Sequence, residues 1–379
     1  MDIAIVGYGI AGISAAVRFR RLGHRISHFE RSKPPIAIGA GMLMHPAAQR
    51  QLQQLGILSD AMACGSPVRR LCAQTARGRS IMDFEYTGVS GGQCGLGIQR
   101  ATLHRLLAHA DAGNNHVRAG RTITSLDPHR GYLFEGPDVR HGPHDLLVIA
   151  DGASSLLRDQ LELPLRRNQR ACSAALVGLV DDPDRLAGDT LVQYFDGARH
   201  LSVWPVGTAE PGGPPRCSIA MNVTVAEARA VRDSGIWRKF VKRLCPAVGR
   251  LLKDPIENKD LHIFSYRDVE LCQCVVGRAV LLGDAAHSMS PQLGNGARLA
   301  MEDAAIVSTL VSQNDELSVA LRAYALTRPQ QVSQYHRASR WLTPLFQSDN
   351  RALAMLRDNL LASAMQMPSV QLLARTLFG

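Results

Sequence analysis

The feature that most constrains the fold of this chain is a glycine pattern at its amino end. Residues 3–6 are a short apolar run rich in β-branched side chains, which is typical of a buried parallel strand. The pattern G-x-G-x-x-G follows at residues 7–12, and a stretch with helical spacing of apolar residues comes after it. Residues 25–29 predict a second strand that ends at Glu30. This order predicts a Rossmann-like unit in an α/β protein.

Each glycine of the pattern has a mechanical role in such a unit. Gly7 permits the tight turn, Gly9 lets the backbone approach a pyrophosphate, and Gly12 lets helix and strand pack closely. The amino end of the helix presents free N–H groups to the phosphates. Glu30 lies about twenty residues on, where an acid accepts the ribose hydroxyls and disfavours a 2′-phosphate. We therefore expect FAD or NAD at this site, and not NADP.

Two later segments repeat the arrangement of a strand followed by an acid. The apolar run 145–150 leads into Asp151-Gly152, and the run 280–283 leads into Asp284. A carboxylate at the end of a strand, followed by small residues, is typical of ligand sites in open α/β sheets. Residues 294–296, Gly-Asn-Gly, then begin a helix and offer free N–H groups at its positive end.

These three segments, in this order and spacing, resemble the flavoprotein aromatic hydroxylases of the p-hydroxybenzoate and salicylate hydroxylase type, the class A flavoprotein monooxygenases. The resemblance rests on the glycine fingerprint, a DG motif at Asp151-Gly152 and a GD motif at Gly283-Asp284. It touches most of the chain outside residues 165–275. Smaller matches lie at Glu30-Arg31, Gly39-Ala40-Gly41, Arg100, and Tyr324 with Arg328.

The resemblance implies a role for each residue of an FAD site. Glu30 and Arg31 would hold the adenosine end, and Arg100 would contact the phosphate or ribityl region. Asp151 would lie at the pyrophosphate side, and Asp284 would take a ribityl hydroxyl. Backbone N–H groups of Gly296 and Ala297, where the helix after the GD motif begins, would stabilise charge on the reduced flavin. The expected cofactor residues are Gly7, Gly9, Gly12, Glu30, Arg31, Gly41, Arg100, Asp151, Asp284, Gly294, Gly296, Ala297 and Arg298.

Arg298 departs from the family pattern, which usually has Asn at this position. Arginine would reach the flavin carbonyl with a full charge, or it would point away toward an anionic substrate. The departure affects the flavin contact expected here, but not the expectation that flavin binds.

The pattern along the chain predicts a Rossmann-like FAD-binding domain, an inserted and mostly antiparallel substrate sheet, and C-terminal helices. Strand runs are expected at 174–180, 190–195, 201–206, 218–223 and 263–267, and helices at 226–252 and from 301 onward, with Pro329 and Pro344 as interruptions. The expected parts are FAD-binding segments at 1–68, 96–165 and 276–310, a hairpin at 69–95 joining the substrate domain at 166–275, and a helical region at 311–379.

The function implied by the resemblance is a monooxygenase that hydroxylates a small aromatic or electron-rich substrate through a flavin C4a-hydroperoxide. NADH or NADPH would visit transiently, because the sequence has no second nucleotide fingerprint. Pro291, by resemblance, lies beside the flavin, where its carbonyl would orient a hydroxyl. His45 would accept a phenol proton, although a hydrogen-bonded loop histidine is an equal alternative. Tyr194, Trp204 and Tyr266 would line the pocket or belong to the core.

Several other functions share this architecture. They are a flavoprotein oxidase, reductase or epoxidase, a halogenase, whose W-x-W-x-x-I-P signature is absent, and a non-catalytic FAD- or NAD-binding sensor. A sensor would need no substrate sheet. The nucleophile pattern of hydrolases, G-x-S-x-G, is also absent.

Composition and charge indicate which kinds of binding partner to expect. The net charge is +10, and the basic residues are scattered along the chain and not gathered in a run. This favours a solvated basic surface over a nucleic-acid partner, and the alternative is an electrostatic field that attracts anionic ligands such as NADPH or a carboxylate substrate. The eight cysteines are dispersed and predict no metal site. No apolar run is long enough to span a bilayer, and the chain passes directly from Met1 into a strand pattern. We expect a cytoplasmic monomer or homodimer whose partners are the substrate, O2 and NAD(P)H.

Overall fold

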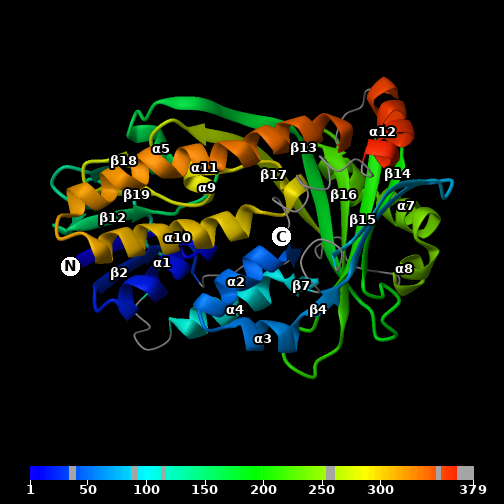
Figure 1. Ribbon diagram of the computed structural model, residues 1–379, viewed down its shortest axis with the longest axis horizontal. Coiled ribbons are helices and arrows are strands. Elements are labelled where there is room, and N and C mark those ends of the chain that lie inside the picture. Colours follow the sequence, from blue (N-terminus) through cyan, green and yellow to red (C-terminus); the bar gives the residue numbers. More distant parts are fainter. Residues whose placement is uncertain are drawn as a thin grey trace.

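The computed structural model describes residues 1–33, 40–86, 93–111, 117–197, 199–252, 261–346 and 351–364. A parallel sheet with its helices forms one half of the molecule, and a large sheet forms the other half (Figure 1). This is the α/β architecture with an inserted sheet that the sequence predicts.

The first sheet has six strands in the order β18-β19-β12-β1-β2-β8, and all neighbours are parallel except β18 and β19. The strands expected before the three motifs are confirmed as β1, β12 and β19, and they are neighbours in the sheet. Because parallel strands end at one edge, the three motifs meet there. The strands are β1 (Asp2–Val6), β2 (Arg25–Glu30), β8 (Val117–Ala119), β12 (Leu146–Ile149), β18 (Val275–Val276) and β19 (Ala279–Leu281).

Two helices pack on this sheet because their inner faces carry small apolar residues. Helix α1 (Ile10–Arg21) buries Ala11, Ala15 and Ala16, and α10 (Gly296–Gln313) buries Ala300 and Ala304. These alanines belong to one buried cluster with the strands of the sheet. This packing places the amino ends of α1 and α10 at the same edge of the sheet as the three motifs.

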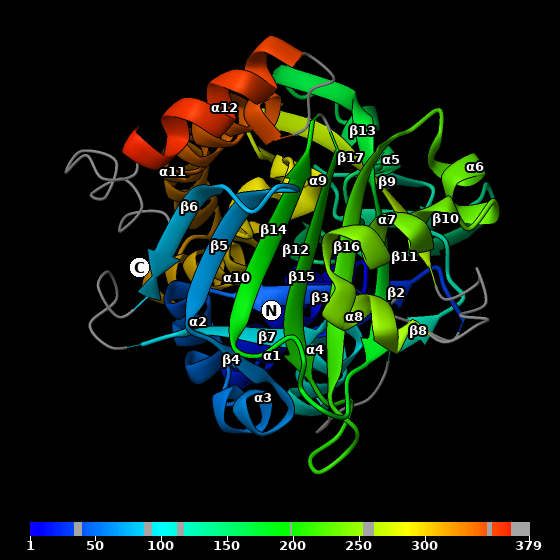
Figure 2. The ribbon, with the colours of Figure 1, turned by 90° about the vertical axis from the view of Figure 1, so that its right-hand side faces the viewer.

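The second sheet has seven strands in the order β17-β13-β16-β15-β14-β5-β6 (Figure 2). Only β14 and β5 are parallel, so the expected antiparallel sheet is confirmed. The hairpin expected from residue 69 onward supplies β5 and β6, while Gly88 lies outside the described residues. The strands are β5 (Arg70–Thr75), β6 (Ser80–Glu85), β13 (Leu165–Asp181), β14 (Thr190–Asp196), β15 (Arg199–Gly207), β16 (Arg216–Thr224) and β17 (His262–Leu271).

One face of the large sheet is covered by helices α6 (Ala228–Asp233), α7 (Ile236–Leu244) and α8 (Pro246–Leu251). The other face looks toward the parallel sheet (Figure 1). A small sheet of β3 (Gly41–Met44), β7 (Gly95–Gln99) and β4 (Ser66–Val68) packs against one end of β15. The remaining elements are β9 (Ser125–Asp127), β10 (Tyr132–Glu135), β11 (Val139–His141), α2 (Pro46–Gln54), α3 (Leu58–Cys64), α4 (Arg100–Ala110), α5 (Leu156–Gln160), α9 (Asp284–His287) and the 3-10 turn η4 (Pro291–Leu293).

The prediction that Pro329 and Pro344 interrupt the last helical region is wrong. Both lie inside α11 (Leu317–Phe346), a single helix of 30 residues, and α12 (Arg351–Ala364) follows. A proline inside a helix removes one backbone hydrogen bond and favours a break. Here the helix continues because buried side chains on both sides of Pro329, including Tyr324 and Val332, hold it against the protein.

Among the described residues, no helix is both long enough and apolar enough to cross a bilayer.

Candidate active site

The glycine loop after β1 is tightly packed on one side and open on the other. Gly7 has φ +104°, and a Cβ there would lie 2.3 Å from the Ala150 carbonyl oxygen. A Cβ on Gly12 would lie 1.9 Å from the Gly7 carbonyl oxygen. A Cβ on Gly9, in contrast, would meet nothing within 4 Å. Gly7 and Gly12 thus leave no room for a side chain, whereas the backbone at Gly9 faces open space.

Three polar side chains fix the peptide groups of this loop. Glu30 accepts a 2.8 Å hydrogen bond from the Tyr8 N–H, at the end of β2 where the sequence places an acid. The His28 ring donates from Nε2 to the Gly7 carbonyl at 2.9 Å, and the His104 ring donates from Nε2 to the Tyr8 carbonyl at 2.7 Å. Sequence reasoning missed both histidines, whose partners lie 21 and 96 residues away. These contacts engage the carbonyls of Gly7 and Tyr8.

The DG motif presents a buried carboxylate directly after β12. Asp151 Oδ1 is buried and has no hydrogen-bond partner among the described residues. Burial raises the pKa of Asp151, although a hydrogen bond from Ser155 opposes the rise. Gly152 has φ +90°, and a Cβ there would meet nothing within 4 Å. An unpaired buried oxygen beside an open backbone is the arrangement expected at a ligand's polar group.

A buried arginine ties the DG motif to the GD motif. Arg158 is 1% exposed, and its Nη1 donates to the carbonyls of Ala153 at 3.0 Å and Ala285 at 3.2 Å. The first carbonyl belongs to the turn after β12, and the second belongs to α9. The ends of two neighbouring strands are therefore held by one guanidinium.

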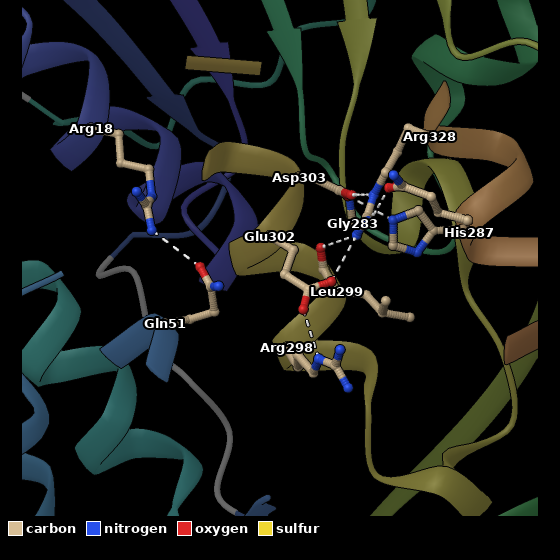
Figure 3. A network of polar contacts seen from close by, with 10 residues as sticks. Arg18, Gln51, Gly283, His287, Arg298, Leu299, Glu302, Asp303 and Arg328 are labelled. Carbon is tan, nitrogen blue, oxygen red and sulfur yellow. Dashed lines mark hydrogen bonds and ion pairs between the residues drawn. The ribbon is translucent and has the colours of Figure 1, made fainter. Parts of the chain in front are cut away.

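The GD motif is organised by the carboxylate of Asp303, which is fully buried in α10 (Figure 3). One oxygen, Oδ2, accepts from the Gly283 N–H and from His287 Nε2, both at 2.6 Å. The other oxygen accepts from Arg328 Nε at 2.6 Å. Burial alone would raise the pKa of Asp303, but His287, Arg328 and the Gly283 N–H together lower it to about 2. The carboxylate stays charged and holds the turn that precedes Asp284.

Asp284 itself is exposed at the first position of α9. Gly283 before it has φ +60°, and a Cβ there would lie 2.9 Å from the Cβ of Ala11 in α1. The turn thus passes directly over α1, which follows the glycine loop. Asp284 is free to contact a ligand that lies along this edge.

The start of α10 is open to the same side. Gly294 has φ +63° and ends the turn η4, and Gly296 is exposed, with nothing within 4 Å of the position of a Cβ. Ala297 is 8% exposed, and Pro291 is exposed at the start of η4. Four of the predicted residues therefore lie together at one helix end.

His45 lies under this turn with both ring nitrogens engaged. The Leu293 carbonyl accepts from Nε2 at 3.2 Å, so Nδ1 carries the lone pair and accepts from the Tyr86 hydroxyl at 2.6 Å. Burial lowers the pKa of His45 to about 4. A neutral imidazole in these contacts has no lone pair left for a substrate proton, so the contacts favour the structural alternative.

Arg298 does not extend to the amino end of its helix. Its Nε donates to Glu302 Oε1 at 2.6 Å, one turn further on (Figure 3). Its guanidinium lies over the Tyr335 ring, 5.6 Å from the ring centroid. Glu302 also pairs with Arg328 at 3.4 Å. Arg298 is thus paired within the helix through Nε, while its Nη1 is buried with no hydrogen-bond partner among the described residues.

The other predicted residues lie around this edge with fewer contacts. Arg31 is exposed, and the half-buried Arg100 donates its backbone N–H to the Ala40 carbonyl at 2.8 Å. Neither guanidinium has a hydrogen-bond partner among the described residues. Gly41 donates its N–H to Ser218 Oγ at 3.1 Å, so it also joins the small sheet to the large one.

Replacing Arg298 with asparagine, the usual residue of the resembled family, should change the affinity for FAD by less than about threefold, because the guanidinium is already paired with Glu302. The measurement is FAD titration of the apoprotein, followed by fluorescence quenching. A loss of FAD affinity of more than about tenfold would show that Arg298 itself holds the flavin.

The two buried histidines of the site should make the folded protein less stable at acidic pH. Burial lowers the pKa of both His28 and His45 to about 4, whereas an unfolded histidine titrates near 6.5. The unfolded chain therefore takes up protons that the folded chain excludes. The stability from the neutral rings is complete above pH 6.5 and is lost as the pH falls toward 4, by about 1.4 kcal/mol per pH unit for each histidine.

Urea unfolding of the protein between pH 7.5 and pH 5 measures this loss. The variant His45→Gln keeps a donor and an acceptor but cannot titrate, so its unfolding free energy should depend less steeply on pH. Equal slopes for the variant and the natural protein would contradict the prediction.

The residues present fit a dinucleotide with an attached ring system. Backbone positions open to a ligand occur at Gly9, Gly152 and Gly296, in all three motifs. The unpaired Asp151 oxygen and the exposed Asp284 add acceptors for hydroxyl groups between them. No group of three or more metal-ligating side chains occurs in the part of the chain that the structure describes.

Comparison with known proteins agrees with this geometry. A family model described as an FAD binding domain matches residues 1–314. The chain is 28% identical over 380 aligned residues to the aurachin C monooxygenase/isomerase of Stigmatella aurantiaca, covering 95% of this chain and 94% of that protein. It is 27% identical over 341 residues to an FAD-dependent urate hydroxylase of Klebsiella pneumoniae, covering 88% and 87%.

The fold is also shared with a solved structure. A variant of Klebsiella pneumoniae HpxO, in complex with FAD, superposes with a TM-score of 0.84 at 24% identity, covering all of this chain and 98% of that one. At this level of identity the likeness shows the fold.

Proposed function

The chain belongs to the family that carries the FAD binding domain, and we propose that it is an FAD-dependent, NAD(P)H-consuming monooxygenase acting on a small aromatic or electron-rich substrate. The observation that supports this best is the meeting of three open motifs at one sheet edge, opposite a large separate sheet. The relatives covering most of the chain are named as monooxygenases or hydroxylases.

Each part of the site has a task in binding FAD. The glycine loop and α1 would receive the pyrophosphate, with Glu30 beside the adenosine ribose. Asp151 and Asp284 would accept from hydroxyls between the two ends of the cofactor. The N–H groups at the start of α10 would stabilise negative charge on the ring. Bound FAD supplies the redox and oxygen chemistry.

The protein's own contribution is to orient the substrate and exclude water. Pro291 is exposed beside the start of α10, and its carbonyl accepts from the Gly294 N–H at 2.9 Å. The second lone pair of this carbonyl is our candidate for contact with a substrate hydroxyl. His45 supports the same turn from below through Leu293. We further propose that NADH or NADPH binds transiently and that the protein acts in the cytoplasm, where both are available.

Oxygen incorporation tests the proposal. The purified protein should take up FAD, turn yellow and oxidise NADH or NADPH faster when substrate is added. Urate, 4-hydroxybenzoate and salicylate are the first compounds to try, and products formed under 18O2 should contain one labelled atom. A colourless protein that binds no FAD overturns the scheme. Release of hydrogen peroxide with no label in any product would favour the oxidase alternative.

A further inference from the structure

The large sheet has two faces of different character. Its outer face packs on α6, α7 and α8 through apolar residues such as Leu176, Val203 and Ile219. The inner face meets the rest of the molecule. Gly41 of β3 donates to Ser218 there, and a Cβ on Gly97 of β7 would lie 1.9 Å from the Pro205 carbonyl oxygen.

The strand register identifies the inner face at the centre of the sheet. Side chains alternate between the two faces along a strand, and directly paired residues share a face. The residues that alternate with the outer apolar positions are therefore on the inner side. At the centre they are Ala175, Val177, Gln193, Ser202, Trp204 and Ala220, which form the inner patch.

The inner patch contains hydrogen-bonding groups but no ionisable side chain. Gln193 Nε2 donates to Ser202 Oγ at 3.3 Å, so these two side chains are neighbours. Trp204 is 8% exposed, and its Nε1 has no hydrogen-bond partner in the described part of the chain. A buried indole N–H usually finds an acceptor. The Trp204 indole N–H is thus a hydrogen-bond donor in the patch that has no acceptor among the described residues.

Four ionisable groups at the far end of the inner face and on the opposite side of the site are neutral or paired with a carboxylate. At the far end of the inner face, Arg357 donates to the carbonyls of Leu345 and Gly197 and pairs with Asp358. Beside it, burial lowers the pKa of His200 to about 4, so that ring is neutral at pH 7. On the opposite side of the site, His45 is neutral, and Arg298 is paired with Glu302 through Nε, while its buried Nη1 has no hydrogen-bond partner among the described residues.

We propose that the site takes an uncharged aromatic substrate, and that Trp204 Nε1–H donates to a carbonyl, hydroxyl or ring nitrogen on it. A carboxylate brought against the inner patch would lose its water without meeting a cationic side chain in the patch itself, which is costly. An uncharged ring with one acceptor would bury apolar surface and satisfy the indole. This inference rests on the proposed function, because it takes the inner patch as the substrate side of the flavin.

Isosteric pairs of compounds test the charge preference. The FAD-loaded protein is titrated with 4-hydroxybenzamide against 4-hydroxybenzoate, salicylamide against salicylate, and 4-hydroxyquinoline-2-carboxamide against its 2-carboxylate. Perturbation of the flavin spectrum gives each Kd without requiring turnover. The amides should bind at least about tenfold tighter than the matched carboxylates. Tighter binding of the carboxylates, or no response to either member of every pair, overturns the inference.

A matched pair of tryptophan variants tests the donor. Trp204→Phe keeps an aromatic ring but removes the N–H, and it should weaken binding of the preferred amide by about tenfold. Trp237 is also buried with an unpartnered Nε1, but it lies in α7 on the outer face. Trp237→Phe should change the same Kd by less than about twofold. Equal effects of the two variants, or none, overturn the role of Trp204.

These experiments distinguish failure of the proposed monooxygenase function from failure of the proposed preference for an uncharged substrate. Absence of FAD uptake or of labelled product counts against the monooxygenase. A protein that binds FAD and hydroxylates only carboxylates leaves the monooxygenase intact and removes the inference about charge.

Discussion

Replacing Asp303 with asparagine should lower the free energy of unfolding by roughly 3–5 kcal/mol, the usual cost of removing one partner from a buried ion pair. Asp303 is fully buried and accepts from Gly283, His287 and Arg328 at once. Asparagine has one acceptor oxygen in place of two, and its amide N–H2 would face a donor. Among the carboxylates of the described residues, Arg328, which is 4% exposed, would be left with only its 3.4 Å contact to Glu302.

Urea unfolding of the apoprotein measures this loss, and Glu302→Gln is its matched control. Glu302 lies next to Asp303 in α10 and also contacts Arg328, but at 3.4 Å and with its side chain 19% exposed. Because Glu302 also pairs with Arg298 at 2.6 Å, the control should cost about 1–2 kcal/mol, still less than Asp303→Asn. If both variants cost the same, Asp303 is not the centre of the network.

Gly9→Ala should weaken FAD binding by about tenfold or more while leaving the stability of the apoprotein within about 0.5 kcal/mol. The backbone at Gly9 has φ −90°, which alanine adopts without strain, and its Cβ would meet no protein atom within 4 Å. The Cβ would instead occupy the open side of the loop, where we place the pyrophosphate.

Gly12→Ala is the contrasting variant, because its Cβ would lie 1.9 Å from the Gly7 carbonyl oxygen. It should destabilise the apoprotein itself, through overpacking, by about 1–3 kcal/mol or more. Thermal unfolding without FAD separates the two variants, and FAD titration then measures affinity. Unchanged FAD affinity in Gly9→Ala would place the pyrophosphate elsewhere.

The sequence predicts the parallel sheet and the positions of its motifs well, because strand, turn and acid are encoded locally. The three glycines and Glu30 can be recognised from spacing alone. Asp303 and Arg158 cannot, since their partners come from segments distant in the chain. His28 and His104 were missed for the same reason, as nothing near them indicates a contact with the glycine loop.

The ion pair of Arg298, in contrast, is encoded locally in the sequence. Its partner Glu302 stands four residues on in the same predicted helix, which is the spacing of a helical ion pair. This local spacing favours a paired arginine over a contact with the flavin carbonyl or with an anionic substrate. The wrong prediction at Pro329 and Pro344 has the opposite origin, because tertiary packing overrides a local preference there.

The continuity of α11 through both prolines limits how the two halves of the molecule can move. Thirty residues of helix span about 45 Å. Arg328 attaches this rod to α10, Ser339 attaches it to the loop after α9, and Arg340 attaches it to Asp268 and Glu270 of β17. It therefore acts as a strut of fixed length between the two sheets. Because α11 joins the two halves, a hinge motion that opens the whole interface is disfavoured. Substrate and product must therefore enter and leave at the sides of the interface or through loop motion.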